Sequence, residues 1–282
     1  MTIFSIVIVN YNHGMYLEHA ICSVLQQSFR DFELIIVDGS STDNSLEIIK
    51  KYAGQLAWWV SEPDKGQSDA FNKGFARALG NFFLWLNADD LMLPGALEAA
   101  SDYLQLHPDC RWLAADTVYF NKTGTIQRCL YGPYWNTWLM KQTTVCNMVN
   151  GPCSIFHRSL YEKVGGVDQE LNFVMDMDLW MKFVDLGVRF HRMHRYIWGF
   201  RIHEGSKTSH SIGNVQNEEF RSERNKVISR AKRVRTQAEF WWLKMHKLTA
   251  GTHFRTIYDT WRWRGSSIDR MISSMSIPKG NK

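Results

Sequence analysis

Short apolar runs alternate with helical patterns through the N-terminal third of the chain, and this alternation constrains the fold more than any other feature. The apolar runs cover residues 4–9, 32–38, 57–62 and 81–86. Between them, apolar positions recur at helical spacing in residues 16–27, 43–52 and 68–79. Near-continuous apolar strands separated by amphipathic helices are typical of a parallel sheet with helices on both faces. We therefore predict an α/β protein with a mostly parallel sheet.

Acidic residues follow three of these strands at the point where each strand ends. Asp38 closes the second run, Asp64 follows the third, and Asp89 and Asp90 follow the fourth. Sheets of this class bind ligands beyond the carboxyl ends of their strands. A buried carboxylate is costly without a partner, so we expect these residues to meet a cation or hydrogen-bond donors. For any one of them a turn or helix cap is the alternative role.

The pattern divides the chain into a globular domain at 1–212 and a tail at 213–282. Within the domain, the alternation holds over 1–109 and weakens over 110–212, where a helix at 176–187 and a strand at 196–203 remain predictable. The chain has five cysteines without metal-ligand spacing, and its first apolar run is too short for a secretory or spanning segment. We expect reduced thiols and a cytoplasmic protein.

The tail is basic and aromatic. From Ala231 onward there are 11 Lys or Arg against 3 Asp or Glu, a net charge of +8 in a chain whose total is +5. Apolar residues recur at helical spacing, which predicts one stripe along a single long helix: Val227, Ala231, Val234, Ala238, Trp241, Met245 and Leu248.

Residues 227–264 therefore read as a surface for an anionic membrane, which would place the protein peripherally at the inner face of the plasma membrane. Packing against the domain and pairing with a second subunit are the alternatives. No nucleic-acid recognition motif accompanies the basic residues.

Six stretches, in order, resemble the family 2 glycosyltransferases, which have the GT-A fold, a Rossmann-like sheet covered by helices. They are "SIVIVNYN" (5–12), "VDGSSTDNS" (37–45), "SEPDKGQSDAFNKG" (61–74), "WLNADDLMLPGAL" (85–97), "GPCSIFHRSLYEKVGGVD" (151–168) and "MDMDLWMKF" (175–183). The resemblance covers residues 3–206 and implies a nucleotide-sugar-binding half at 1–109, an acceptor-binding half at 110–212, and a role in bacterial surface glycan synthesis.

The resemblance implies a nucleotide diphosphate sugar as donor, most simply a UDP-sugar. Asp38 matches the residue that accepts the uracil N3 proton, with Tyr11 beside the base or in the core. Asp69 matches a position facing the donor, and Lys65 either reaches the phosphates or is merely solvated. The remaining donor contacts are expected from Val9, Asn87 and Ala88, with Asn87 on the nucleoside because its amide adds no charge.

A divalent cation, Mn²⁺ or Mg²⁺, is the expected cofactor, since it would neutralise the diphosphate. Asp89 and Asp90 are its predicted ligands. The resemblance adds His203, at the end of the strand at 196–203. The loop at 200–209 would then order over the donor.

The stretch "MDMDLW" puts Asp176 at the position of the catalytic base of inverting family members, with Asp178 as a secondary candidate. The family's preceding glutamate is Met175 here. A plain helix cap is the alternative for either aspartate.

The resulting prediction is a metal-dependent inverting glycosyltransferase acting on a glycan or a polyprenyl-linked acceptor, with a homo-oligomer through the tail as a further option. The alternatives are a sugar-phosphate nucleotidyltransferase, for which "NYNHGMY" lacks the glycine-rich loop, and a catalytically silent sugar-binding or assembly subunit.

Overall fold

A computed structural model describes residues 3–142, 149, 151–206, 218–231 and 237–276. The N-terminal half alternates strands and helices: β1 Phe4–Asn10, α1 Gly14–Leu25, β2 Phe32–Asp38, α2 Ser45–Tyr52, β3 Trp58–Ser61, α3 Gln67–Phe75, β4 Phe82–Asn87, β5 Leu91–Met92 and α4 Ala96–Leu106. The second half contains β6 Trp112–Asn121, β7 Ile126–Leu130, α5 Thr137–Gln142, β8 Ser154–His157, α6 Arg158–Lys163, α7 Met175–Asp185 and β9 His191–Ile202. The tail contains α9 Glu218–Arg230, α10 Gln237–Thr249, α11 Thr252–Trp263 and α12 Ile268–Ser276.

The strands form one sheet in the order β3-β2-β1-β4-β8-β6-β9-β5, with β7 paired to β6. The first four strands are parallel, and their register sets Asn10 opposite Asp38 and Val9 opposite Asn87. The carboxyl ends of β1, β2 and β4 therefore meet at one edge. Strand β8 then runs antiparallel to β4 and β6, while β9 pairs parallel to β6 and antiparallel to β5. The predicted α/β class with a mostly parallel N-terminal sheet is confirmed.

Alternate residues of the central strands point to opposite faces of the sheet, because side chains alternate along a strand. One face buries Ile6, Ile8 and Leu34 under α1, α2 and α4. The other buries Val7, Ile35 and Trp85 under α3 and α7. Gly74 of α3 lies so close to β1 that a Cβ there would meet Val7 Cγ1 at 2.4 Å. Both faces are therefore covered, as the continuous apolar strands predict.

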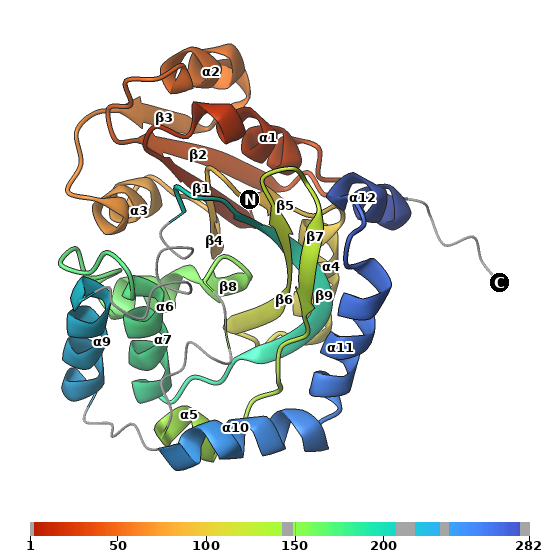
Figure 1. Ribbon diagram of the computed structural model, residues 1–282. Helices are drawn as coiled ribbons and strands as arrows, with labels where there is room; N and C mark the ends of the chain where they lie inside the picture. The colour runs from red at the N-terminus through yellow and green to blue at the C-terminus, as the bar shows by residue number, and fades with distance from the viewer. Residues whose placement is uncertain (1–2, 143–148, 150, 207–217, 232–236, 277–282) are drawn as a thin grey trace.

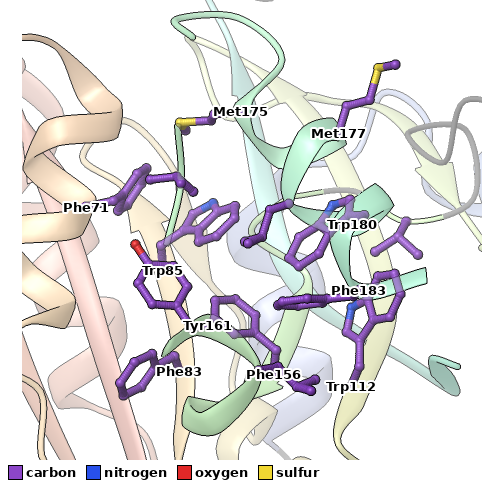
Figure 2. Close-up of a cluster of buried hydrophobic side chains, with 14 of the residues drawn as sticks. Phe71, Phe83, Trp85, Trp112, Phe156, Tyr161, Met175, Met177, Trp180 and Phe183 are labelled. Carbon is purple, nitrogen blue, oxygen red and sulfur yellow. The ribbon is translucent and has the colours of Figure 1, made fainter. Parts of the chain in front are cut away.

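A cluster of aromatic side chains joins α7 to the sheet (Figure 2). The Trp180 indole lies between two others, with ring centroids 5.6 Å from Trp85 and 5.2 Å from Trp112, both in stacked orientation. Phe156 and Phe183 close the cluster at its edges. Trp180 lies in the middle of α7 and is fully buried, so this packing fixes the helix against β4 and β6.

Several predicted boundaries are wrong. The helix predicted to reach residue 79 ends at Phe75, because the N–H groups of Leu79 and Gly80 donate to Glu33 Oε1 and turn the chain away. The predicted strand at 196–203 begins earlier, at His191, since β9 pairs with β6 from that residue onward. Helix α5 was not predicted, because its segment carries no clear apolar period.

The tail is not one long helix. Helix α9 ends at Arg230 and α10 begins at Gln237, and Figure 1 shows the two running in different directions around the second half of the domain. Val227 of α9 and Leu243 of α10 are buried in the same core cluster as α7. Helix α11 lies beside β7, where Thr256 Oγ1 accepts a hydrogen bond from Tyr131 N at 3.0 Å.

Three further expectations concern residues outside the described part of the chain, wholly or in part. The predicted domain boundary at residue 212, like stripe residue Val234 and the end of the loop at 200–209, falls outside the described residues. Within the described part of the chain, none of the helices combines the length and the apolar character needed to cross a membrane.

Candidate active site

The candidate site lies where β1, β2 and β4 end, between α3, the start of α7 and the end of β9. Asp38 holds the first three strand ends together. Its carboxylate accepts hydrogen bonds from Asn10 Nδ2 at 2.6 Å, Ser41 Oγ at 2.5 Å, Ser61 Oγ at 2.6 Å and Ser41 N at 3.0 Å. The side chain is fully buried. Its oxygens are thus engaged within the protein, and its contact with a nucleotide base stays a prediction.

The loops after β1 and β2 contain the two non-glycine residues with positive φ in the described chain, Asn12 at 56° and Ser40 at 64°. Asn12 Oδ1 accepts a hydrogen bond from Thr42 N at 2.8 Å, so the two loops brace each other. Such backbone strain often accompanies binding sites. Tyr11 is 61% exposed beside these loops, which excludes the core-packing alternative, while Val9 is buried on β1.

The start of α3 connects β4 to the loop before α7. Gln67 Nε2 donates to Asn87 Oδ1 at 2.9 Å, and Ser68 Oγ donates to Leu171 O at 2.5 Å. Asp69 is buried and accepts hydrogen bonds from Lys65 N and Gln169 Nε2, both at 3.1 Å. The side chain of Lys65 is exposed. Asp69 therefore organises this turn, and both residues' donor contacts stay predictions.

Asp89 and Asp90 have different surroundings. Asp90 is 1% exposed, accepts hydrogen bonds from Asn87 Nδ2 and Arg201 N, each at 2.9 Å, and lies beside the buried Ala88. Burial, together with the charge of Asp89, raises the pKa of Asp90 well above its usual value. Asp90 is accordingly tied into the interior, whereas Asp89 keeps a partly exposed carboxylate.

Asp89 meets two histidines. His203 Nε2 lies 2.9 Å from Asp89 Oδ2, and the His13 ring packs edge-on against His203 with centroids 5.8 Å apart. One potential ligand atom from each of the three residues lies within 4.8 Å of the others, and no other group of His, Cys, Asp or Glu in the described chain meets this criterion. Partly buried nitrogen and oxygen donors from three loops suit a divalent cation. The predicted pair of Asp89 and His203 comes together, whereas Asp90 is not part of this group.

Asp176 lies in the first turn of α7, next to the end of β4. A Cβ at Gly151 would lie 3.1 Å from Asp176 Oδ2 and 3.3 Å from the Trp85 ring, so both residues border the same space. Burial raises the pKa of Asp176 to about 6. Asp176 Oδ1 accepts a hydrogen bond from Met177 N at 2.7 Å. A carboxylate in this state can take up a proton near neutral pH.

Asp178 is turned to a different environment. It is 5% exposed and forms an ion pair with Lys182, with Nζ 2.7 Å from Oδ2. Residues two apart on a helix do not share a face. The secondary role predicted for Asp178 remains untested.

Three residues of the site region were missed from the sequence. His13 joins Asp89 and His203, while Arg201 donates from Nε to Asp89 O at 2.8 Å. Glu223 of α9 accepts hydrogen bonds from Asn172 N and Phe173 N, each at 2.8 Å, just before α7 begins. The sequence signal for His13 was its place in the loop after the first strand. Glu223 lies in a polar stretch with no motif.

The Glycosyl transferase family 2 model matches residues 5–165 of the chain. An uncharacterised glycosyltransferase of Nostoc is 40% identical over 104 residues, which are 36% of this chain and 32% of that protein. The putative glycosyltransferase EpsE of Bacillus subtilis is 25% identical over 204 residues, 70% of this chain and 72% of its own.

Two solved structures share the fold. Staphylococcus aureus TarS in complex with UDP-GlcNAc superposes with a TM-score of 0.64 at 21% identity, covering 80% of this chain and 66% of that one. The mannosyltransferase PcManGT of Pyrobaculum calidifontis, in complex with GDP-Man and Mn²⁺, gives 0.62 at 15% identity, covering 97% and 79%. Structural similarity at such low sequence identity shows the fold alone, and it shows that the chain has the GT-A fold.

Proposed function

The chain belongs to glycosyl transferase family 2, and from this premise we propose that it transfers a sugar from a nucleotide diphosphate sugar to an acceptor hydroxyl. The observation that carries the proposal is the position of Asp176. Its carboxylate has a pKa raised to about 6 and borders the end of the strand that leads to Asp89. A carboxylate that can accept a proton near neutral pH, next to the strand that leads to Asp89, supports the proposal.

The proposed reaction is a single displacement with inversion. Asp176 accepts the proton of the acceptor hydroxyl while that oxygen forms a bond to the anomeric carbon. The bond from the anomeric carbon to the diphosphate oxygen breaks, and its electron pair leaves with the nucleotide diphosphate. Attack from the face opposite the leaving group inverts the configuration.

Asp89 and His203 would hold the divalent cation, Mn²⁺ or Mg²⁺. When bound, that ion supplies positive charge against the donor diphosphate and the departing nucleotide. Arg201 supports the site from the protein side, because its guanidinium is fixed by Asp89 O and by the Tyr16 ring at 4.7 Å. We favour a UDP-sugar on the motif at Asp38; TarS was solved with UDP-GlcNAc, whereas PcManGT was solved with GDP-Man.

We also propose that the tail contacts an anionic membrane and so places the site near a lipid-linked glycan acceptor. Seven large apolar side chains of α10 and α11 are at least 49% exposed: Trp241, Trp242, Met245, Phe254, Ile257, Tyr258 and Trp261. Cations accompany them, with Lys244 over the Trp241 ring at 5.4 Å and Arg255 over the Tyr258 ring at 5.6 Å. Exposed aromatic and basic side chains suit the lipid headgroup region.

The test is hydrolysis and transfer with a panel of UDP- and GDP-sugars, with and without Mn²⁺. We expect one donor class to be consumed by the wild type, bound but not consumed by Asp176→Asn, and not bound by Asp89→Ala. Asp185→Asn, at the far end of the same helix, is the matched control and should behave as wild type. The anomeric configuration of the product, read by NMR, tests inversion. Failure to bind or consume any nucleotide sugar would refute the proposal.

A further inference from the structure

We propose that His13 is a third ligand of the cation site, and that the resulting His-Asp-His donor set selects first-row transition ions such as Mn²⁺ over Mg²⁺. The inference deepens the proposed function, because it rests on Asp89 and His203 being part of that site. It adds a residue from a different loop and a consequence for the choice of metal.

The position of His13 is fixed by its backbone. His13 O accepts hydrogen bonds from Tyr16 N and Leu17 N, each at 2.9 Å, at the start of α1. On the next residue, Gly14 N donates to Asp43 Oδ2 at 2.8 Å, and any Cβ at Gly14 would collide with Asn44 Oδ1. The loop after β1 is therefore pressed against the loop before α2. His13 presents its ring toward His203 from a rigid support.

The distances suit a shared ion. Ligand atoms at about 2.1 Å from one cation lie at most about 4.2 Å from each other. The ligand atoms of His13, Asp89 and His203 already lie within 4.8 Å of one another, so a small closure brings them to bonding distance. The side chains of Asp89 and His203 are 14% and 8% exposed, so both are largely but not completely buried.

The donor set favours transition ions for a chemical reason. Mg²⁺ prefers oxygen ligands in octahedral geometry and gives up its water reluctantly. Imidazole nitrogen binds first-row transition ions better, with affinity rising along the series from Mn²⁺. A site with two imidazoles and one carboxylate should therefore have a low affinity for Mg²⁺. The set predicted from the sequence has two carboxylates and one imidazole, and it would lower the affinity for Mg²⁺ less.

The experiment is a titration of the metal-free full-length protein with Mn²⁺, followed by the EPR signal of the free ion, and competition with Mg²⁺. We expect His13→Ala to weaken Mn²⁺ binding by at least about 10-fold, since the loss of even an outer partner of a metal ligand typically costs about 10- to 100-fold. We expect His13→Asp to retain Mn²⁺ and to gain affinity for Mg²⁺, so that the Mn²⁺ preference narrows. His19→Ala, which removes an exposed histidine of α1, the helix that follows His13, should bind as wild type.

Each outcome decides. Wild-type Mn²⁺ affinity in both His13 variants, or equal affinity of the wild type for Mg²⁺ and Mn²⁺, would overturn this inference while the proposed function stands. Absence of any Mn²⁺ binding by the wild type would overturn it as well. If donor turnover is also absent, the proposed function fails too. Thermal melts of the metal-free variants identify any folding defect. A gain in Mg²⁺ affinity in His13→Asp cannot arise from misfolding, because misfolding would weaken the binding of both ions.

Discussion

The indole of Trp85 stacks on the indole of Trp180, with ring centroids 5.6 Å apart and ring planes 10° apart. Trp85 lies on β4, the strand that leads to Asp89, and Trp180 lies on α7, the helix that begins with the candidate base Asp176. The stack therefore sets the spacing between the candidate cation site and the candidate base. Rigid aromatic packing is well suited to this, because buried rings have few alternative positions.

Removing this stack should be costly. We expect Trp180→Ala to lower the free energy of unfolding by about 3–5 kcal/mol, because it leaves a large cavity beside Trp85 and Trp112. Urea unfolding followed by circular dichroism measures the loss. Trp261→Ala is the matched control, since Trp261 is 78% exposed, and should change stability by about 0.5 kcal/mol at most. Similar losses in the two variants would contradict the packing argument.

The pH dependence of transfer should report Asp176. Burial raises the pKa of its carboxyl to about 6, and a general base must be ionised to accept a proton. We expect kcat/KM for the acceptor, at saturating donor, to rise with pH and level off above about pH 7, with about a tenth of the plateau value at pH 5. A profile that is flat down to pH 5 would count against Asp176 as the base.

The same shift predicts an effect on stability. The pKa of Asp176 is higher in the folded than in the unfolded protein, so ionisation above about pH 6 costs the folded state free energy. Asp176→Asn should therefore raise stability at pH 7.5 by about 2–3 kcal/mol, and this advantage should shrink as the pH falls from 6 and disappear near pH 3, below both pKa values. Thermal melts at the two pH values test this. Asp178→Asn should instead lower stability, because it leaves Lys182 without its partner.

Glu223 should act as a positioning residue for α7. Its two oxygens hold Asn172 N and Phe173 N, immediately before the helix that carries Asp176. We expect Glu223→Ala to lower kcat about tenfold, equivalent to about 1.4 kcal/mol, with KM for the donor unchanged. Glu223→Gln, which keeps one acceptor, should lose less of the rate than Glu223→Ala. The control Glu219→Ala, at an exposed position of α9, should keep the wild-type rate. An equal rise in KM for the donor in all three variants would contradict the positioning role and indicate a loss of structure instead.

The tail should bind vesicles through its exposed aromatic side chains. We expect Trp261→Ser to weaken cosedimentation with phosphatidylglycerol vesicles at least several-fold, and binding to fall as salt rises, because basic side chains contribute. Leu106→Ser is the control, since Leu106 is exposed to the same 78% but lies on α4. Equal binding by the two variants, or binding to neutral vesicles alone, would exclude this surface.

The sequence by itself determined the frame of the site. Strand and helix periods are local properties, so the alternation over the N-terminal third was enough to predict the parallel strands and the edge at which they end. That edge is where Asp38, Asn87 and Asp89 lie. The family resemblance added His203, whose Nε2 lies 2.9 Å from Asp89 Oδ2 in the structure, while the metal role of the pair stays a prediction. The strand ends lie together because regular hydrogen bonding between parallel strands aligns their carboxyl ends at one edge of the sheet.

Tertiary structure alone decided which polar groups at that edge remain available. The carboxylates of Asp38 and Asp90 accept hydrogen bonds from neighbouring donors of the protein. Asp89 instead lies near His13, whose ring position depends on the contact between the loops after β1 and β2. It also divided the tail's apolar residues, burying Val227 and Leu243 and leaving Trp241 outside. Periodicity records which residues share a helix face, but burial depends on the surface that another part of the chain offers, and that surface exists only after folding.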